Sequence, residues 1–426
     1  MSLPESEDGC YLTAHELAAL LIFLLTYGLI SFGRLGKSRI EMPSAALLGG
    51  ALMLIFGLLS PAEALSDINW NTIVLLLGMM LTVSSMEACG FFHWISGLIV
   101  KGAHRQFSFV VYTSLLTAFL SALILNDAVV LIFTPVIIIA ARRINVSPVP
   151  ALIMEAISAN IGSAATEVGN PQNAYIASVS GVAFRIFSFY LLPVTVLSLL
   201  VALIISYFFA EKRDAGADTG VKEERVNRLP LIYIIASVTA IFAGFFTSSE
   251  THIPIATVAL IGGVINFFVT PLITGRNSQE LLVRIDWGII LFFIGLFILI
   301  GGIESSGLLS GIVYAITFAH PDALESIAGL NVATAILSNL VSNVPAVLLL
   351  SPVIKGGATT KLWVTLAGSS TLAGNATIIG AAANVIVARS ASREGVSITL
   401  RQFMKYGLPI TLISLLFNYL LIVLLP

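Results

Sequence analysis

Charged residues are scarce in this 426-residue sequence. Asp, Glu, Lys and Arg together make up 10% of it, and the formal net charge is only −2. A folded face that binds nucleic acid needs clustered Lys and Arg side chains. The composition gives no sign of such a face, so we expect no nucleic-acid partner.

Cysteine and histidine are also rare. Cys10 lies in a polar N-terminal segment and Cys89 in an apolar run, and two thiols are too few for a disulfide framework or a thiolate metal site. The five His residues are scattered near predicted loops or helix ends, and none pairs with another at metal-ligand spacing. No nucleophile and base form a recognisable pair. We therefore expect no enzyme activity, no metal site and no bound cofactor.

Hydrophobic residues are abundant instead. They make up 57% of the chain, and the mean hydropathy is +0.99. Apolar stretches of roughly 20 residues, the length that crosses a bilayer as a helix, recur from end to end. The composition predicts an all-α polytopic protein embedded in the lipid bilayer.

The charges between the apolar runs predict how the chain crosses the membrane. The first residues, MSLPESEDGC, are acidic where a signal peptide is basic, so the first apolar run is expected to be a retained span. Lys and Arg prefer the cytoplasmic side, which places Arg34, the polar linker 211–229 and Arg389 inside. Both termini then lie outside, in an inner (plasma) membrane protein with about ten spanning helices plus two hairpins.

The runs 107–125 and 127–141 predict a re-entrant hairpin. Arg105 precedes them and Arg142 follows them, so both ends belong in the cytoplasm. Two full-length crossings would satisfy the same charges. The hairpin is favoured because a polar turn, Asn126-Asp127, joins the runs with no extramembrane loop around it.

The two halves of the sequence repeat each other. A shift of 217 positions aligns LSALILNDAVVLIFTPVI (120–137) with LSNLVSNVPAVLLLSPVI (337–354), with nine identities in 18 positions. Chance matching of leucines would not also align tryptophan, glycine and glutamate at one offset. The same shift pairs Trp70 with Trp287, Gly78 with Gly295, Glu87 with Glu304 and Gly90 with Gly307.

A shift of 211 positions aligns SANIGSAATEVGNPQN (158–173) with SSTLAGNATIIGAAAN (369–384). By the predicted orientation, the first hairpin opens to the cytoplasm and the second to the outside, so the repeats are inverted, an arrangement typical of secondary transporters. We predict a first repeat at 1–210 with hairpin 107–141 and broken helix 149–178, the cytoplasmic linker 211–229, and a second repeat at 230–426 with hairpin 327–354 and broken helix 363–388.

Segment 158–173 is too polar, and too rich in Gly and Pro, to face lipid. A helix broken at mid-membrane exposes N–H groups at the start of one part and C=O groups at the end of the other. Pro171 is expected to prevent the upstream helix from continuing, and the glycines permit the turn. Amide and hydroxyl side chains can then replace the hydration shell of a solute or cation.

Two hairpin tips and two breaks are expected to converge on one site. A single Asn or Ser in a membrane bundle often only links helices by hydrogen bonds, but four polar clusters in symmetric positions favour a binding site. The predicted substrate-binding or ion-binding residues are Asn126, Asp127, Asn160, Ser163, Thr166, Glu167, Asn170, Asn173, Ser342, Asn343, Ser369, Ser370, Thr371, Asn375, Thr377 and Asn384.

Three carboxylates, Asp127, Glu155 and Glu167, lie in apolar context with no Lys or Arg in their motifs. Burial favours the neutral form of a carboxyl group, so such residues can carry protons. We predict proton coupling at Asp127, on the hairpin tip, and at Glu167, within the break. Glu155 can equally lie at interfacial depth. Glu87 and Glu304, which match across the repeat, are interpreted as helix-end residues of the scaffold.

These motifs resemble the ion transporter superfamily, and within it the group of arsenite permeases and NhaD-type antiporters. LNDAVVLIFTPVI is similar to the first hairpin of that group, ANIGSAATEVGNPQN to its first broken helix, LVSNVPAVLLL to its second hairpin and AGSSTLAGNATIIGAAANVIV to its second broken helix. Asn126 and Asp127 match the Asn-Asp tip of arsenite permeases. Ser342 and Asn343 match the first two residues of the Ser-Asn-Thr tip of the sodium-dicarboxylate branch, and Val344 stands in place of the Thr.

The resemblance implies an elevator-type carrier, often a homodimer, in which hairpins and broken helices move against a scaffold. The leading hypothesis is export of arsenite or antimonite driven by protons on Asp127 or Glu167, and an arsenite exporter can have a soluble ATPase partner. Neutral arsenous acid is a small triol that amides and hydroxyls can bind without Arg. A sodium-coupled importer of dicarboxylates or other anions, and a sodium/proton antiporter using Asp127, are the alternatives. A channel is disfavoured because the interrupted motifs do not form a continuous polar file.

Overall fold

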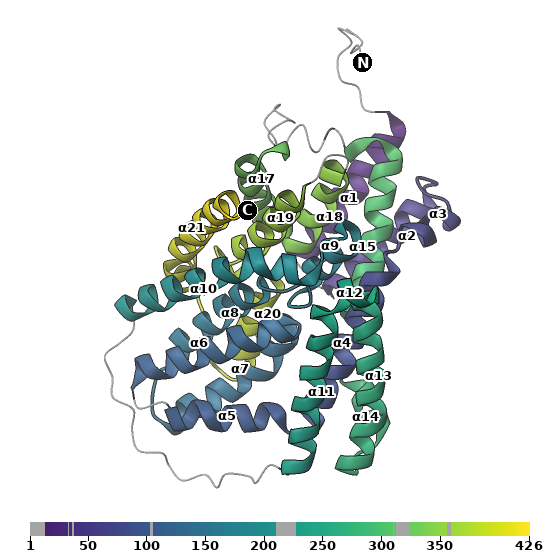
Figure 1. Ribbon diagram of the computed structural model, residues 1–426. Coiled ribbons are helices and arrows are strands. Elements are labelled where there is room, and N and C mark those ends of the chain that lie inside the picture. Colours follow the sequence, from purple (N-terminus) through teal and green to yellow (C-terminus); the bar gives the residue numbers. More distant parts are fainter. Residues whose placement is uncertain are drawn as a thin grey trace. The chain divides into compact units, whose positions relative to one another are not determined.

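The computed structural model describes residues 13–32, 34–35, 38–102, 105–209, 227–309, 311, 324–355 and 359–426, and these are almost entirely helical (Figure 1). Their only strands are β1 (Arg34–Leu35) and β2 (Ser38–Arg39), which form a two-residue antiparallel pair. Seven helices in these ranges are long and apolar enough to cross a membrane, and shorter apolar helices accompany them. The chain is therefore an all-α multi-pass membrane protein, as predicted. Most of the predicted linker 211–229 lies outside the described residues.

The described residues form two compact units. The first lies within Met1–Asn69 and Trp287–Ala319 and contains α1 (Ala14–Phe32), α2 (Met42–Ile55), α3 (Pro61–Asp67) and α15 (Trp287–Ser306). The second lies within Trp70–Asp286 and His320–Pro426. Each unit takes elements from both halves of the sequence, so the two repeats are not separate compact bodies.

The second unit contains two groups of helices. In the first group, α4 (Trp70–Ala88), α11 (Arg228–Phe246) and α13 (Ile255–Thr274) lie side by side (Figure 1). The short helices α5 (Phe91–Gly102), α12 (Ser248–Thr251) and α14 (Ser278–Val283) belong to the same stretches of chain. The second group holds the hairpins, the broken helices, and the long helices α10 (Phe184–Phe209) and α21 (Leu400–Leu424), which pack on each other.

The predicted repeat appears in the packing of paired glycines. A Cβ atom on Gly78 of α4 would lie 2.4 Å from the carbonyl carbon of Ala259 on α13. Its repeat partner Gly295, on α15 of the first unit, would place a Cβ atom 2.5 Å from the carbonyl carbon of Ala46 on α2. In each unit, therefore, a helix of one half packs closely on a helix of the other through a residue that must be glycine.

Another glycine pair ends the two repeat-related helices. Gly90 follows α4 with a φ of 76°, and Gly307 follows α15 with a φ of 82°. A positive φ favours glycine because other residues meet their own Cβ in this region. Gly90 accordingly divides the apolar run 71–100 into two helices, α4 and α5.

Both predicted hairpins are present as pairs of helices joined by very short turns. In the first, α6 (Gln106–Leu123) packs on α7 (Asn126–Arg143), and Ile124 and Leu125 join them. The prediction that Asn126 and Asp127 form the turn was wrong, because both residues lie in the first turn of α7. In the second, α17 (Ile327–Val341) packs on α18 (Asn343–Lys355), and Ser342 alone joins them with a φ of 76°.

Both predicted broken helices are also interrupted. The first consists of α8 (Pro148–Ser163) and α9 (Pro171–Ser180), and the second of α19 (Thr360–Ala373), the 3₁₀ turn η2 (Ile378–Gly380) and α20 (Ala382–Arg393). The predicted role of Pro171 was wrong: α8 ends well before it, and Pro171 instead begins α9, where its missing N–H costs no helical hydrogen bond. Asn170 caps α9 by accepting from the Asn173 N–H (2.8 Å).

Candidate functional site

Each hairpin tip is hydrogen-bonded to the break of its own half. In the first half, the backbone N–H of Asn126 donates to the carbonyl oxygen of Gly169 (2.9 Å). In the second half, the amide orientation of Asn343 that satisfies its neighbours lets Nδ2 donate to the carbonyl oxygen of Gly380 (2.9 Å). These residues are equivalent in the two repeats. The tips therefore lie at the level of the breaks, as the hairpin interpretation requires.

Glycine is required where the tips meet the breaks. A Cβ atom on Gly169 would lie 2.4 Å from the carbonyl oxygen of Ser163 and 2.8 Å from that of Ser121. A Cβ atom on Gly380 would lie 2.7 Å from the carbonyl oxygen of Gly374. In both halves the backbone of the break packs so closely against other backbone that no side chain fits.

Asn173 and Asn384 hold the two breaks in the same way. Nδ2 of Asn173 donates to the carbonyl oxygens of Ser163 (3.2 Å) and Thr166 (3.0 Å). Nδ2 of Asn384 donates to the carbonyl oxygens at the two equivalent positions, 374 and 377, at 2.7 and 2.9 Å. One amide thus satisfies two carbonyl oxygens that the end of a helix leaves without helical partners.

Asn160 joins the two halves of the sequence. Its Nδ2 donates to Oδ1 of Asn375 (2.9 Å) and Oδ1 of Asn384 (2.9 Å), both in the second break. Its Oδ1 accepts from Nδ2 of Asn126 on the first hairpin tip (3.1 Å). All four side chains are buried. The structure thus brings four predicted site residues from three separate motifs into one hydrogen-bonded cluster.

Thr371, the repeat equivalent of Asn160, makes the reciprocal connection. Its Oγ1 accepts from Nδ2 of Asn170 (3.2 Å) and from Nε2 of Gln172 (3.2 Å), both at the start of α9. Asn160, near the end of α8, therefore contacts the second break, and Thr371, near the end of α19, contacts the first break. We refer to the side chains of Asn126, Asn160, Asn170, Gln172, Thr371, Asn375 and Asn384 as the central network.

Several predicted hydroxyl groups donate to backbone carbonyl oxygens, and one of them, Oγ of Ser163, also accepts from Nδ2 of Asn170 in the central network (3.0 Å). In the first half, Oγ of Ser163 donates to the carbonyl oxygen of Asn160 (2.9 Å) and Oγ1 of Thr166 to that of Ala122 (2.7 Å). In the second half, Oγ of Ser369 donates to the carbonyl oxygen of Thr365 (2.5 Å) and Oγ of Ser370 to that of Ala367 (3.1 Å). These bonds brace the helices, and the Thr166 bond ties the first break to the first hairpin. Ser342 is half-buried at the second tip.

Some buried polar atoms around the breaks have no hydrogen-bond partner within the described part of the chain. They are Oδ1 of Asn173, Nδ2 of Asn375, Oγ1 of Thr377 and Oε1 of Glu167. Burying such an atom without a partner costs about 1–3 kcal/mol. The set includes donors and acceptors from both halves, which a small hydroxylated solute could satisfy.

The three predicted carboxylates all belong to the first half. The 217-residue and 211-residue shifts align Asp127, Glu155 and Glu167 with Val344, Leu366 and Ile378. Asp127 is half-buried in the first turn of α7, and Glu167 is 1% exposed in the loop between α8 and α9. None of the three predicted carboxylates thus has an acidic counterpart at the equivalent position of the second half, whereas the amide network takes residues from both halves.

Glu155 is fully buried within the protein. Its two carboxyl oxygens lie 3.2 and 3.1 Å from Oγ1 of Thr134 on α7. Glu87 has a different environment, since it forms an ion pair with Arg284 at partly exposed helix ends. That pairing agrees with its interpretation as a scaffold residue.

Three polar residues of this region were missed by the sequence analysis. Gln172 belongs to the central network. Ser338 and Asn339, near the end of α17, donate to the carbonyl oxygens of Ser370 (2.9 Å) and Ala373 (3.0 Å). Ser338 aligns with Ser121 in the repeat, so the shared polar position was a usable signal.

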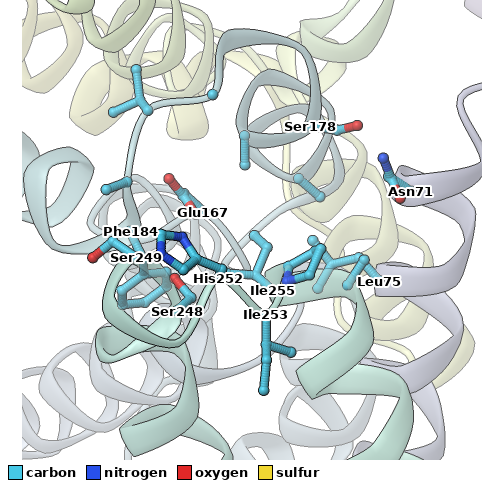
Figure 2. A pocket seen from close by; sticks show the side chains of 17 residues that line it. Asn71, Leu75, Glu167, Ser178, Phe184, Ser248, Ser249, His252, Ile253 and Ile255 are labelled. Carbon is cyan, nitrogen blue, oxygen red and sulfur yellow. The ribbon is translucent and has the colours of Figure 1, made fainter.

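A cavity of about 330 Å³ lies beside the first break, between α9, α4 and the segment that contains α12 and the start of α13. In the view of Figure 2, Glu167, Ser248, Ser249 and His252 lie on one side of it and Asn71, Leu75 and Ser178 on the other. His252 is exposed at the end of α12, with a φ of 57°. In the described ranges, no group of three or more His, Cys, Asp or Glu is placed to hold a metal ion.

Comparisons with known proteins agree with this architecture. A transporter of Mycobacterium tuberculosis described as uncharacterized is 30% identical over 424 residues, covering 94% of this chain and 96% of the relative. The silicon efflux transporter LSI3 of Oryza sativa subsp. japonica is 26% identical over 435 residues, covering 87% and 90%. A Dictyostelium discoideum transporter named arsB is 26% identical over 510 residues, covering 93% and 88%.

Two solved structures are similar in fold. The Alcanivorax borkumensis YdaH transporter matches with a TM-score of 0.62 at 15% identity, over 96% of each chain. Neisseria gonorrhoeae MtrF, described as illuminating a class of antimetabolite efflux pumps, matches with a TM-score of 0.55 at 10% identity, over 97% of this chain and 95% of that one.

The comparison with protein families shows to which family the chain belongs. The family model described as citrate transporter matches residues 27–367, most of the length. The predicted resemblance to the arsenite permease group of the ion transporter superfamily is confirmed. The chain is a membrane transporter, not an enzyme, and it belongs to the citrate transporter family.

Proposed function

We propose that this transporter exports a small uncharged hydroxylated acid, arsenous or antimonous acid, in exchange for protons. The observation that carries the proposal is the composition of the central network, which consists of amide and hydroxyl side chains without a Lys or Arg among their hydrogen-bond partners in the described residues. A multiply charged carboxylate would need cationic partners to offset its desolvation. A neutral triol needs only donors and acceptors.

The names of two relatives support a substrate of this chemical class. One is named a silicon efflux transporter and the other arsB. Silicic and arsenous acids are both small, uncharged and hydroxylated near neutral pH. The unpartnered polar atoms of Asn173, Asn375 and Thr377 would bind such hydroxyl groups from both breaks at once.

Protons supply the driving force in this proposal. Glu167 and Asp127 would take up protons on one side of the membrane and release them on the other, while the hairpins and broken helices move together against α4, α11 and α13. For this cycle we propose the orientation predicted from the sequence: the protein lies in the inner membrane, both termini are on its outer side, and the linker 211–229 is in the cytoplasm. We expect a homodimer to be the working unit.

A sodium-coupled citrate or dicarboxylate importer is the second candidate. The family description favours it, and so does the second hairpin tip, where Asn343 lies within hydrogen-bond distance of the oxygens of Ser338, Ser370 and Gly380 at 2.6, 3.0 and 2.9 Å. Sodium binds preferentially to clustered oxygen atoms of this kind.

Uptake into everted membrane vesicles separates the two candidates. Arsenite, sodium, citrate and succinate are tested in parallel, with and without a proton gradient, and with Asp127→Asn beside the wild type. We expect arsenite uptake that collapses when the proton gradient is dissipated and that Asp127→Asn lacks. Citrate or succinate transport that requires sodium would overturn the proposal and select the second candidate.

A further inference from the structure

The cavity beside the first break has a buried carboxyl group at its inner end. Glu167 lines the cavity while only 1% exposed, and its Oε1 has no hydrogen-bond partner among the described residues. The lining also includes exposed residues, His252, Ile253 and Pro254. The cavity therefore joins exposed residues of the second unit to a buried carboxyl group whose Oε1 has no partner among the described residues.

Part of the lining of this cavity is polar. Asn71, Ser178, Ser248, Ser249 and His252 contribute polar side chains, as the close-up in Figure 2 shows. Buried water needs a polar site with room for a molecule and two or more hydrogen-bond partners. A volume of about 330 Å³ accommodates several water molecules.

The position of the cavity assigns it to one face of the membrane. Its outer end is the connection between α11 and α13, two neighbouring helices that are each long enough to span. With the linker 211–229 in the cytoplasm, this connection lies on the outer side. Protons that drive export come from that side.

Glu167 is also connected to the central network through its own loop. Its neighbour Thr166 donates to the Ala122 carbonyl oxygen on α6 (2.7 Å), and Gly169 accepts from Asn126 on the hairpin tip (2.9 Å). A change of charge on Glu167 therefore acts on a loop that is hydrogen-bonded to both arms of the first hairpin. This gives proton uptake a structural route to the substrate site.

We propose that this cavity is the path by which protons from the outer side reach Glu167, separate from the path of the substrate. This inference deepens the proposed function and rests on it for the identity of the driving ion. In the step itself, hydronium in the cavity gives its proton to the Glu167 carboxylate, leaving water and a neutral carboxyl group. His252 also lines this cavity.

Other charged groups around Glu167 are few. The rim carries the ion pair between Arg185 and Glu250 (2.6 Å), next to cavity residues of α10 and α12. Asp127 lies on the hairpin tip, and Glu155 lies on α8. From the other helices that pack on α9, Thr371 of α19 and Ser351 of α18 form hydrogen bonds to it, and α4 lines the cavity with Asn71 and Leu75.

Infrared spectroscopy of the protein in liposomes tests the path without any substrate. The C=O band of protonated Glu167 is identified by its loss in Glu167→Gln, and its rise is followed after a rapid acidification of the medium. A Ser248→Cys variant, made in a background with Cys10→Ser and Cys89→Ala, is labelled with a bulky neutral maleimide. Thr251→Cys is the matched control, because Thr251 is exposed on the same short helix and does not line the cavity.

We expect the label on Ser248→Cys to slow protonation of Glu167 on the order of tenfold, as blocking a hydrated path does, and the label on Thr251→Cys to leave the rate unchanged. An unchanged rate in labelled Ser248→Cys, or the absence of any Glu167 band, would overturn the inference. The vesicle uptake experiment is independent of this readout. A wild type that protonates Glu167 through the cavity yet fails to move arsenite would refute the proposed substrate and leave the proton path standing.

Discussion

In the first half of the sequence, the hairpin tip and the broken helix carry Asp127 and Glu167, whereas the equivalent positions of the second half carry Val344 and Ile378. The two halves are nevertheless held in similar ways. In each, the Asn of the hairpin tip donates to the carbonyl oxygen of a glycine in the break, through the backbone N–H of Asn126 and the side-chain Nδ2 of Asn343. In each, one Asn amide also donates to two carbonyl oxygens of the break. The difference teaches that two requirements are separable. Both halves close a broken helix with the same kind of hydrogen bonds, and in the proposed function only the first half supplies the proton-carrying side chains.

The largest expected effect comes from removing that charge. Asp127→Asn and Glu167→Gln should each abolish proton-driven accumulation of substrate in everted vesicles, because the neutral side chain can no longer bind and release a proton. Their counterparts Val344→Asn and Ile378→Gln introduce the same side chains at half-buried positions of the second half. Those variants should stay within about twofold of the wild type. If Val344→Asn and Ile378→Gln abolished accumulation as Asp127→Asn and Glu167→Gln do, the proposed difference between the two halves would be refuted.

The next effect concerns the glycines of the two breaks. Gly169→Ala and Gly380→Ala should each destabilise the protein by about 1–3 kcal/mol, because the added methyl group meets fixed backbone oxygen at 2.4 Å and 2.7 Å. Thermal unfolding in detergent measures the change, and Gly169→Ala should be the more damaging. Gly181→Ala is a useful control for a glycine of a different kind: its φ is 65° but nothing lies within 4 Å of an added Cβ. An alanine tolerated equally at all three positions would contradict the close packing of the breaks.

A smaller effect distinguishes the two anchoring amides. Asn173→Ala and Asn384→Ala both leave two buried carbonyl oxygens without the amide donor. Asn384 also accepts from Asn160, whereas Oδ1 of Asn173 has no partner within the described residues. Asn384→Ala should therefore lower the melting temperature further, by the equivalent of about 1 kcal/mol. The same loss in both variants would mean that the bond to Asn160 contributes nothing.

Much of the candidate site could be predicted because its sequence signals are local. Asparagine, glycine and proline in an apolar helix are costly unless they interrupt it, so segment 158–173 indicated a break. The internal repeat then located the second break, and Asn173 and Asn384 do occupy equivalent positions in the structure. Orientation, homodimer formation and coupling ion stay predictions.

The remaining features depend on long-range packing, which the pattern of residue types does not encode. The hydroxyls of Ser369 and Ser370 were predicted to face the site, but each bonds to the preceding turn of its own helix, a local alternative that Ser always has in a helix. The cavity at Glu167 was not predicted, because part of its lining comes from the segment 248–256 between two spans, and no sequence motif connects that segment with the first break. The division into compact units also cuts across the repeats.

The most direct test of the account is a double-mutant cycle between Asn160 and Asn384, which belong to different halves and share one hydrogen bond of 2.9 Å. The free energies of unfolding of Asn160→Ala, Asn384→Ala and the double variant are compared with that of the wild type in one detergent. If the two breaks form a single site, the two substitutions should be coupled by about 0.5–3 kcal/mol. Strictly additive effects would contradict a site built jointly by the two halves.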